Sequence, residues 1–354
     1  MKQLAGIIAL ADGSTRQGVV RFGDRIEAVD LASTASGLYI LPGPIDLQVN
    51  GAGSLSVASG SADDLRAIAR VLAHEGTTAF MPTAITAPLD RIEAIDRAID
   101  QARADQFGDP AEAAILGMHL EGPFIARLGM HPRFNLTPIG EPFARVMRLR
   151  SLRLITLAPE LAGAREAIAR LTAHGVVVSL GHSDATFDQA MQAIAAGAPM
   201  CTHLFNAMRP LHHREPGIAA AFLSTGYAAL IPDGVHVHPA MLRLAIKARG
   251  TANIIITTDK SPLDADIKAR DGAARLADGT LAGSIISMLD GIRLIVEQAG
   301  VPLGEASRMA SANPAAVLGL GDRGRIEPGA RADLIVLDRE LKLKTVFVGG
   351  RELN

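Results

Sequence analysis

Short apolar runs alternate with amphipathic, alanine-rich stretches from Pro42 to Gly321. Continuous apolar runs favour buried β-strands, whereas apolar positions spaced three and four residues apart favour helices. The apolar runs predict strands at residues 45–49, 78–80, 114–120, 152–157, 176–180, 200–204, 228–231 and 254–258. The amphipathic stretches predict helices at residues 62–74, 89–104, 163–174, 186–196, 239–249 and 288–298.

This alternation indicates the α/β class and, more narrowly, a (β/α)₈ TIM-like barrel, in which eight parallel strands are each followed by a helix. Parallel strands are buried on both faces, which explains the continuous Val, Ile and Leu runs. A doubly wound open sheet is the alternative. That fold usually has a phosphate-binding glycine loop after its first strand, but Gly51-Ala52-Gly53-Ser54 does not continue as GxGxxG. The barrel is therefore the predicted fold.

The two ends of the chain contain short strands and turns instead of long helices. Strands are predicted at residues 4–9, 18–22, 26–29, 333–337 and 345–348. The first apolar run is short and has no small-residue cleavage site after it, so we expect a strand there and not a signal peptide. We predict that the ends pair as one small β-sandwich domain, made of residues 1–41 plus 322–354, and that residues 42–321 form the barrel.

Composition and charge exclude several classes of partner. The 354 residues carry a formal net charge of −2, so no global positive field would attract nucleic acid, and the 3% of aromatic residues, with no Trp, are too few for base stacking. No run of about 20 apolar residues predicts a membrane span. We therefore expect a cytoplasmic protein without nucleic-acid or membrane partners. The single cysteine excludes an internal disulfide and a Cys-rich zinc site, which leaves ten histidines and the carboxylates for any metal chemistry.

Four ionisable side chains stand at the ends of predicted barrel strands. They are Glu121, His182, His203 and Asp259. The carboxyl ends of barrel strands form one rim, where the active sites of such barrels lie. Each residue alone could be an ordinary buried polar group. Together, two imidazoles and a carboxylate are typical ligands of a divalent metal with an open position for water, and a second carboxylate could transfer that water's proton.

The sequence around these residues resembles that of the amidohydrolase superfamily and, more closely, the N-acetylglucosamine-6-phosphate deacetylases. The resemblance covers essentially the whole chain. Pro-Gly-Pro-Ile-Asp at 42–46 and Gly-Arg-Ile-Glu-Pro-Gly at 324–329 are superfamily-wide motifs. Leu-Glu-Gly-Pro-Phe at 120–124 and Thr-His-Leu-Phe-Asn-Ala-Met at 202–208 are specific to the deacetylases.

The resemblance implies a role for each matching residue. Glu121, His182 and His203 would bind one divalent metal ion per subunit, with zinc expected and iron, manganese or cobalt as alternatives. Asp259 would be the catalytic acid and base. Arg214 would reach into the neighbouring subunit's active site, which implies a homodimer. The expected contacts with an amino-sugar phosphate are Met130, His131, Asn206, Ala207, Arg214, His236, Leu281, Ala282 and Gly283.

The activity that the resemblance implies is metal-dependent hydrolysis of the N-acetyl group of N-acetylglucosamine 6-phosphate, giving glucosamine 6-phosphate and acetate. Three alternatives stay open. The substrate could be the galactosamine epimer or another N-acylated amino sugar, the enzyme could hydrolyse a cyclic amide, or the barrel could be an inactive subunit. Sequence alone does not fix the configuration of the sugar at C4.

The chain departs from the superfamily pattern at three places. The first barrel strand ends in Gln48-Val49-Asn50, where many amidohydrolases have His-x-His, so we predict a single metal with Gln48 and Asn50 hydrogen-bonding near the attacking water. The loop from Glu121 to His131 is shorter than expected and lacks a lysine pair. Lys260 would lower the pKa of Asp259 if it lay close, or else point to solvent. His119 shares a strand face with Glu121 and could support a ligand through a hydrogen bond.

Overall fold

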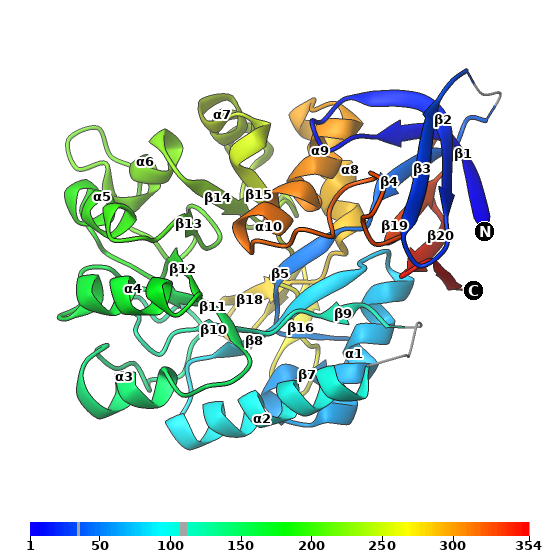
Figure 1. Cartoon of the computed structure of the whole chain (residues 1–354). Helices are drawn as coiled ribbons and strands as arrows, with labels where there is room; N and C mark the ends of the chain where they lie inside the picture. Colours follow the sequence, from blue (N-terminus) through cyan, green and yellow to red (C-terminus); the bar gives the residue numbers. More distant parts are fainter. Residues whose placement is uncertain (34–35, 107–111, 354) are drawn as a thin grey trace.

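The computed structural model describes residues 1–33, 36–106 and 112–353. Its chain forms a barrel surrounded by helices, with a sheet built from both ends of the chain at one side (Figure 1). The N- and C-termini lie next to each other on that sheet. Within the described residues, no helix is long and apolar enough to cross a membrane.

The barrel consists of parallel strands that neighbour one another in sequence order. The order excludes the doubly wound alternative, whose strand order reverses partway. The barrel closes where Val49 pairs in parallel with Lys260. There the backbone N–H of Asn50 donates to the backbone carbonyl of Lys260 at 2.7 Å. Among the described residues the eight strands are β5 (Ile45–Val49), β8 (Ala79–Ile85), β10 (Met118–Glu121), β11 (Leu152–Leu157), β12 (Val177–Leu180), β13 (Met200–Cys201), β14 (Tyr227–Leu230) and β15 (Ile254–Ile256).

The predicted strand at 114–120 is interrupted. Its first part, β9 (Ala114–Ile115), pairs with β8, and its second part is β10. Gly117 lies between them at φ +132°, where a Cβ atom would come within 2.7 Å of the Ser151 carbonyl oxygen. A side chain at this position would be strained, so the break depends on glycine.

Helices cover the outside of the barrel (Figure 1). Four of them were not predicted, because each has at most eight residues and so shows no long helical period: α3 (Gly140–Val146), α6 (Gly217–Ser224), α9 (Leu303–Ala310) and α10 (Ala312–Val317). The described helices are α1 (Ala62–His74), α2 (Leu89–Asp105), α3 (Gly140–Val146), α4 (Ala164–Ala173), α5 (Phe187–Ala195), α6 (Gly217–Ser224), α7 (Pro239–Arg249), α8 (Met288–Ala299), α9 (Leu303–Ala310) and α10 (Ala312–Val317).

The ends of the chain form one sheet that curls into a sandwich. Its strands, in spatial order, are β21 (Arg351–Leu353), β20 (Leu343–Val348), β19 (Leu334–Leu337), β4 (Tyr39–Pro42), β1 (Lys2–Ala9), β2 (Thr15–Phe22) and β3 (Ile26–Leu31). Although β2 and β20 are not neighbours in this order, the rings of Phe22 and Phe347 lie 5.1 Å apart. The sheet therefore folds over its own core. The predicted sandwich is confirmed, while its boundaries at residues 41 and 322 stay a prediction.

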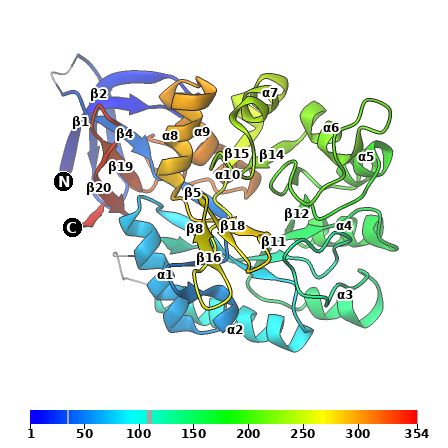
Figure 2. The ribbon, with the colours of Figure 1, turned by 180° about the vertical axis from the view of Figure 1, so that it is seen from behind.

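A small three-stranded sheet, absent from the sequence prediction, lies across one end of the barrel (Figure 2). It consists of β16 (Lys268–Arg270), β17 (Ala273–Arg275) and β18 (Leu281–Ser284), all between β15 and α8. Lys260 bridges it to the barrel by pairing with Ser284. Met130, from the loop after β10, packs against the apolar core of this sheet. The sheet thus sits over the carboxyl ends of the barrel strands.

Candidate metal centre and active site

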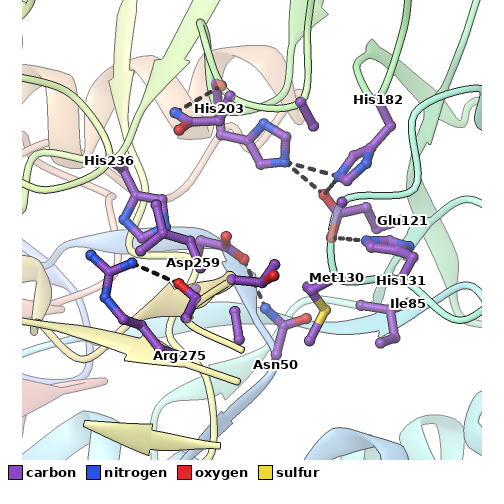
Figure 3. Close-up of a pocket in the computed structure, with 18 residues that line it drawn as sticks. Asn50, Ile85, Glu121, Met130, His131, His182, His203, His236, Asp259 and Arg275 are labelled. Atoms are coloured by element: carbon purple, nitrogen blue, oxygen red, sulfur yellow. Dashed lines mark hydrogen bonds and ion pairs between the residues drawn. The ribbon is translucent and has the colours of Figure 1, made fainter. Parts of the chain in front are cut away.

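Glu121, His182, His203 and Asp259, the four residues predicted to carry the chemistry, line one pocket of about 350 Å³ at the carboxyl ends of the strands (Figure 3). Glu121 is the last residue of β10, and the other three follow β12, β13 and β15. His182, His203 and Asp259 have φ angles of +48°, +28° and +50°. Non-glycine residues rarely adopt this left-handed conformation, and where they do they often serve a functional site.

Glu121, His182 and His203 form a tight, buried triad. The Oε1 atom of Glu121 lies 3.2 Å from Nε2 of His182 and 3.0 Å from Nε2 of His203. The two Nε2 atoms are 3.2 Å apart. Among the described residues this is the group whose His and carboxylate atoms converge closely enough to hold a metal ion.

The proton positions in the triad favour a bound cation. His182 Nδ1 lies 2.6 Å from the Arg127 carbonyl, which can only accept, so Nδ1 carries the hydrogen. The Nε2 lone pair then faces the carboxylate of Glu121, another acceptor. Although burial opposes ionisation, the neighbouring imidazoles of His131, His182 and His203 hold the pKa of Glu121 well below its usual range. Facing acceptors repel each other unless a cation lies between them, so these residues fit a divalent metal.

Two further side chains orient the Glu121 carboxylate. Gln48 Nε2 donates to Oε1 at 3.0 Å. His131 Nε2 lies 3.4 Å from Oε2, and Nδ1 of the same ring is 3.0 Å from the Thr86 hydroxyl. Burial lowers the pKa of His131, which favours its neutral form. Both oxygens of Glu121 are therefore fixed by side chains of the barrel rim.

Asp259 faces the same pocket and is held by Asn50, whose Nδ2 donates to Oδ1 at 2.8 Å (Figure 3). Burial and the nearby charge of Glu121 raise the pKa of Asp259 to about 6, against the opposing effects of His203 and His236. A carboxyl group with a pKa near neutrality is suited to accept a proton and later to donate it.

Lys260 takes neither of the two positions considered from the sequence. Its ammonium group is buried and lies 3.0 Å from both carboxylate oxygens of Glu75, directly after α1. The carbonyls of Ile285 and Ile286 complete its surroundings, at 3.4 and 3.3 Å. Lys260 therefore points away from the pocket, whereas Asp259 points into it.

The expected hydrogen bond between His119 and a ligand does not form. His119 is buried beneath the pocket, with Nδ1 3.0 Å from the Leu47 carbonyl and Nε2 2.8 Å from the Thr156 hydroxyl. Burial lowers its pKa to about 4, so the ring is neutral. His119 therefore supports the rim indirectly, through the backbone next to Gln48.

Most of the expected substrate contacts line the pocket, but Arg214 does not. It lies on an exposed loop and donates to His213 Nε2 at 2.8 Å. Arg275 of β17 lines the pocket and was missed, because no barrel strand precedes it. The sequence did contain a signal, because Arg275 follows an Asp-Gly turn and two apolar residues, a pattern that is typical of a half-buried hairpin. The lining residues predicted from sequence are Asn50, Glu121, Met130, His131, His182, His203, Asn206, Ala207, His236, Asp259, Leu281, Ala282 and Gly283.

The chain is similar to known proteins over nearly its whole length. The amidohydrolase family matches residues 39–353. An N-acetylglucosamine-6-phosphate deacetylase of Bos taurus is 36% identical, with 93% of this chain and 87% of the relative covered. An N-acetylgalactosamine-6-phosphate deacetylase of Escherichia coli O157:H7 is also 36% identical, with 92% and 91% covered.

A solved structure agrees with these sequence relatives. A mutant N-acetyl-D-glucosamine-6-phosphate deacetylase of Mycobacterium smegmatis, in complex with N-acetyl-D-glucosamine-6-phosphate, has a TM-score of 0.90 to this chain. The two are 32% identical, and the likeness covers 99% of this chain and 98% of the other. The chain therefore belongs to the amidohydrolase family, and within it to the N-acetylglucosamine-6-phosphate deacetylases.

Proposed function

We propose that this protein hydrolyses the N-acetyl group of N-acetylglucosamine 6-phosphate to glucosamine 6-phosphate and acetate. The observation that carries the proposal is the buried triad of Glu121, His182 and His203 facing Asp259 across one pocket. The names of the relatives support the choice of substrate.

The triad would hold one divalent metal ion, which when bound supplies Lewis acidity that lowers the pKa of a water molecule and polarises a carbonyl. Asp259 accepts the proton of the attacking water, because its carboxylate lies in the same pocket. It then donates that proton to the departing sugar amine, since an amide C–N bond breaks readily only when the nitrogen is protonated. Asn50 holds the carboxylate in place through its Nδ2 group.

His236 and Asn50 offer acceptors for the sugar. His236 Nδ1 lies 2.6 Å from Asp233 Oδ2, and this contact, which outweighs the cost of burial, lowers the pKa of Asp233. With Nδ1 donating to Asp233, Nε2 keeps its lone pair for a substrate hydroxyl. Asn50 Oδ1 has no partner among the described residues, so it can accept from the acetamide N–H.

We propose a single metal ion per subunit, because the first barrel strand presents two amides that are already engaged. Gln48 donates to Glu121 and Asn50 donates to Asp259. Neutral amides are weak ligands for a borderline-soft cation. Zinc is the expected metal, with iron, manganese and cobalt as alternatives. Elemental analysis of the purified protein should find about one equivalent, as a mononuclear three-ligand site requires.

The galactosamine epimer is a second candidate substrate. The Escherichia coli O157:H7 relative named for that epimer is as similar in sequence as the bovine relative named for the glucosamine form. Parallel assays with both epimers therefore decide between two enzymes that share one mechanism.

We also propose a homodimer in which Arg214 reaches the neighbouring subunit's active site. Arg214 is exposed and does not line the pocket of its own chain. A guanidinium fork suits a phosphate dianion. The mass in solution, measured by light scattering, tests the dimer, and a monomer at working concentration contradicts it. A cytoplasmic location stays a prediction from the sequence.

The activity is tested by measuring acetate release from both hexosamine epimers, with and without the 6-phosphate. The Asp259→Asn variant should bind metal and release little acetate. Asp266→Asn is the matched control, since this carboxylate is exposed on the loop that follows. Wild-type activity in Asp259→Asn would exclude the assigned role, and no acetate from any of the four sugars would exclude the proposed function.

A further inference from the structure

Arg275 is the only arginine or lysine that lines the pocket within the described residues. The carboxylate and the two histidines of the triad lie on one side of Asp259, and Arg275 lies on the other, next to His236 (Figure 3). The two ends of the pocket therefore carry different kinds of polar group. One end collects metal ligands, and the opposite end presents a permanent positive charge.

The guanidinium of Arg275 has few partners of its own. Among the described residues, its one hydrogen bond goes to the Gly279 carbonyl, at 2.9 Å from NH1, and its Nε is buried without a partner. No carboxylate pairs with it in the described part of the chain. Other half-buried arginines do have one, such as Arg145 with Glu93 and Arg323 with Asp333. Burying part of a cation without a counter-ion costs free energy of folding, and an anionic ligand bound next to the cation would offset this cost.

The segment that carries Arg275 is tied to the catalytic rim. Its hairpin turns at Gly279, with φ +88°, and continues into β18, whose residues line the same pocket. The Ser284 amide donates to the Asp259 carbonyl at 2.9 Å. A Cβ atom on Gly283 would lie 2.5 Å from that carbonyl oxygen, so β18 packs directly on the Asp259 backbone. The position of Arg275 relative to Asp259 is thus set by the backbone.

We propose that Arg275 anchors the phosphate of the substrate from within the same chain. With the phosphate at Arg275, the acetamide at the other end of the sugar lies toward Asp259 and the triad. This inference rests on the proposed function, which supplies the phosphorylated sugar. It adds a specificity-determining cation to each subunit's own pocket, separate from Arg214 of a neighbouring subunit.

The test compares kcat/KM for acetate release from the phosphorylated and unphosphorylated sugars. In Arg275→Met the ratio of the two values should fall on the order of ten- to a hundredfold, the effect of losing a hydrogen bond to a charged group. Arg275→Lys keeps a cation without the fork and should retain part of the ratio. Arg270→Met is the matched control, because Arg270 is exposed on the same small sheet, and its ratio should match wild type.

Binding gives a second readout that needs no turnover. Calorimetry of the metal-loaded protein with glucose 6-phosphate, and with glucose for comparison, should show weaker phosphate-dependent binding in Arg275→Met. Equal metal content in the variant and wild type shows that the pocket has folded. If wild type releases acetate and Arg275→Met keeps the wild-type ratio, the anchor is excluded while the proposed function stands. If wild type releases none, the proposed function fails, and unchanged glucose 6-phosphate binding in Arg275→Met would exclude the anchor independently.

Discussion

The buried ion pair between Lys260 and Glu75 should respond unequally to removal of its two members. The side chain of Lys260 is 8% exposed and that of Glu75 is 32% exposed. Glu75→Ala leaves a buried ammonium with only the carbonyls of Ile285 and Ile286 nearby, which should cost about 3 kcal/mol in the free energy of unfolding. Lys260→Met keeps the apolar stem packed and leaves a carboxylate that can turn into water, so the cost should be about 1 kcal/mol.

Urea denaturation of the metal-loaded protein, followed by circular dichroism, measures both costs. Glu166→Ala and Lys247→Met, on exposed positions of α4 and α7, are matched controls and should change stability by about 0.5 kcal/mol or less. The Glu75→Ala/Lys260→Met double variant should be more stable than Glu75→Ala alone, because it no longer buries an unpaired charge. A double variant less stable than Glu75→Ala, or a larger loss in Lys260→Met, would refute this reasoning.

Three further predictions concern catalysis. Asp259→Asn should lower kcat at least about 100-fold at unchanged metal content, which acetate release and elemental analysis together test. Asp259 must be ionised to act as a base, so kcat/KM should fall as the pH drops through the raised pKa of Asp259, which is about 6 without metal and lower with a bound cation. A pH profile of kcat/KM measures this fall. A shift of the acidic limb of that profile in Lys260→Met would contradict the finding that Lys260 points away from Asp259. Chelation should abolish acetate release and zinc should restore it; full activity in metal-free protein would contradict the assignment of Glu121, His182 and His203.

Much of the fold follows from local pattern. The bounds of α1 and α7 agree with the prediction, because their apolar positions keep a clear helical period and their ends are marked by Ser61 and Pro239. The strands β13 and β15 are shorter than their apolar runs. There the chain turns into the pocket at His203 and Asp259, and the apolar pattern does not show where the backbone leaves the barrel. The small sheet over the barrel mouth has strands too short and too mixed in composition to be predicted.

The sequence by itself determined that Glu121, His182, His203 and Asp259 would meet, because the carboxyl ends of barrel strands share one rim. Only the tertiary structure decided what surrounds them. Lys260 pairs with a residue 185 positions away, and Arg275 enters the pocket on an insertion that folds back over the barrel. Strand order follows from local periodicity, whereas the direction of a side chain after a strand depends on contacts between segments distant in sequence, which no local pattern encodes.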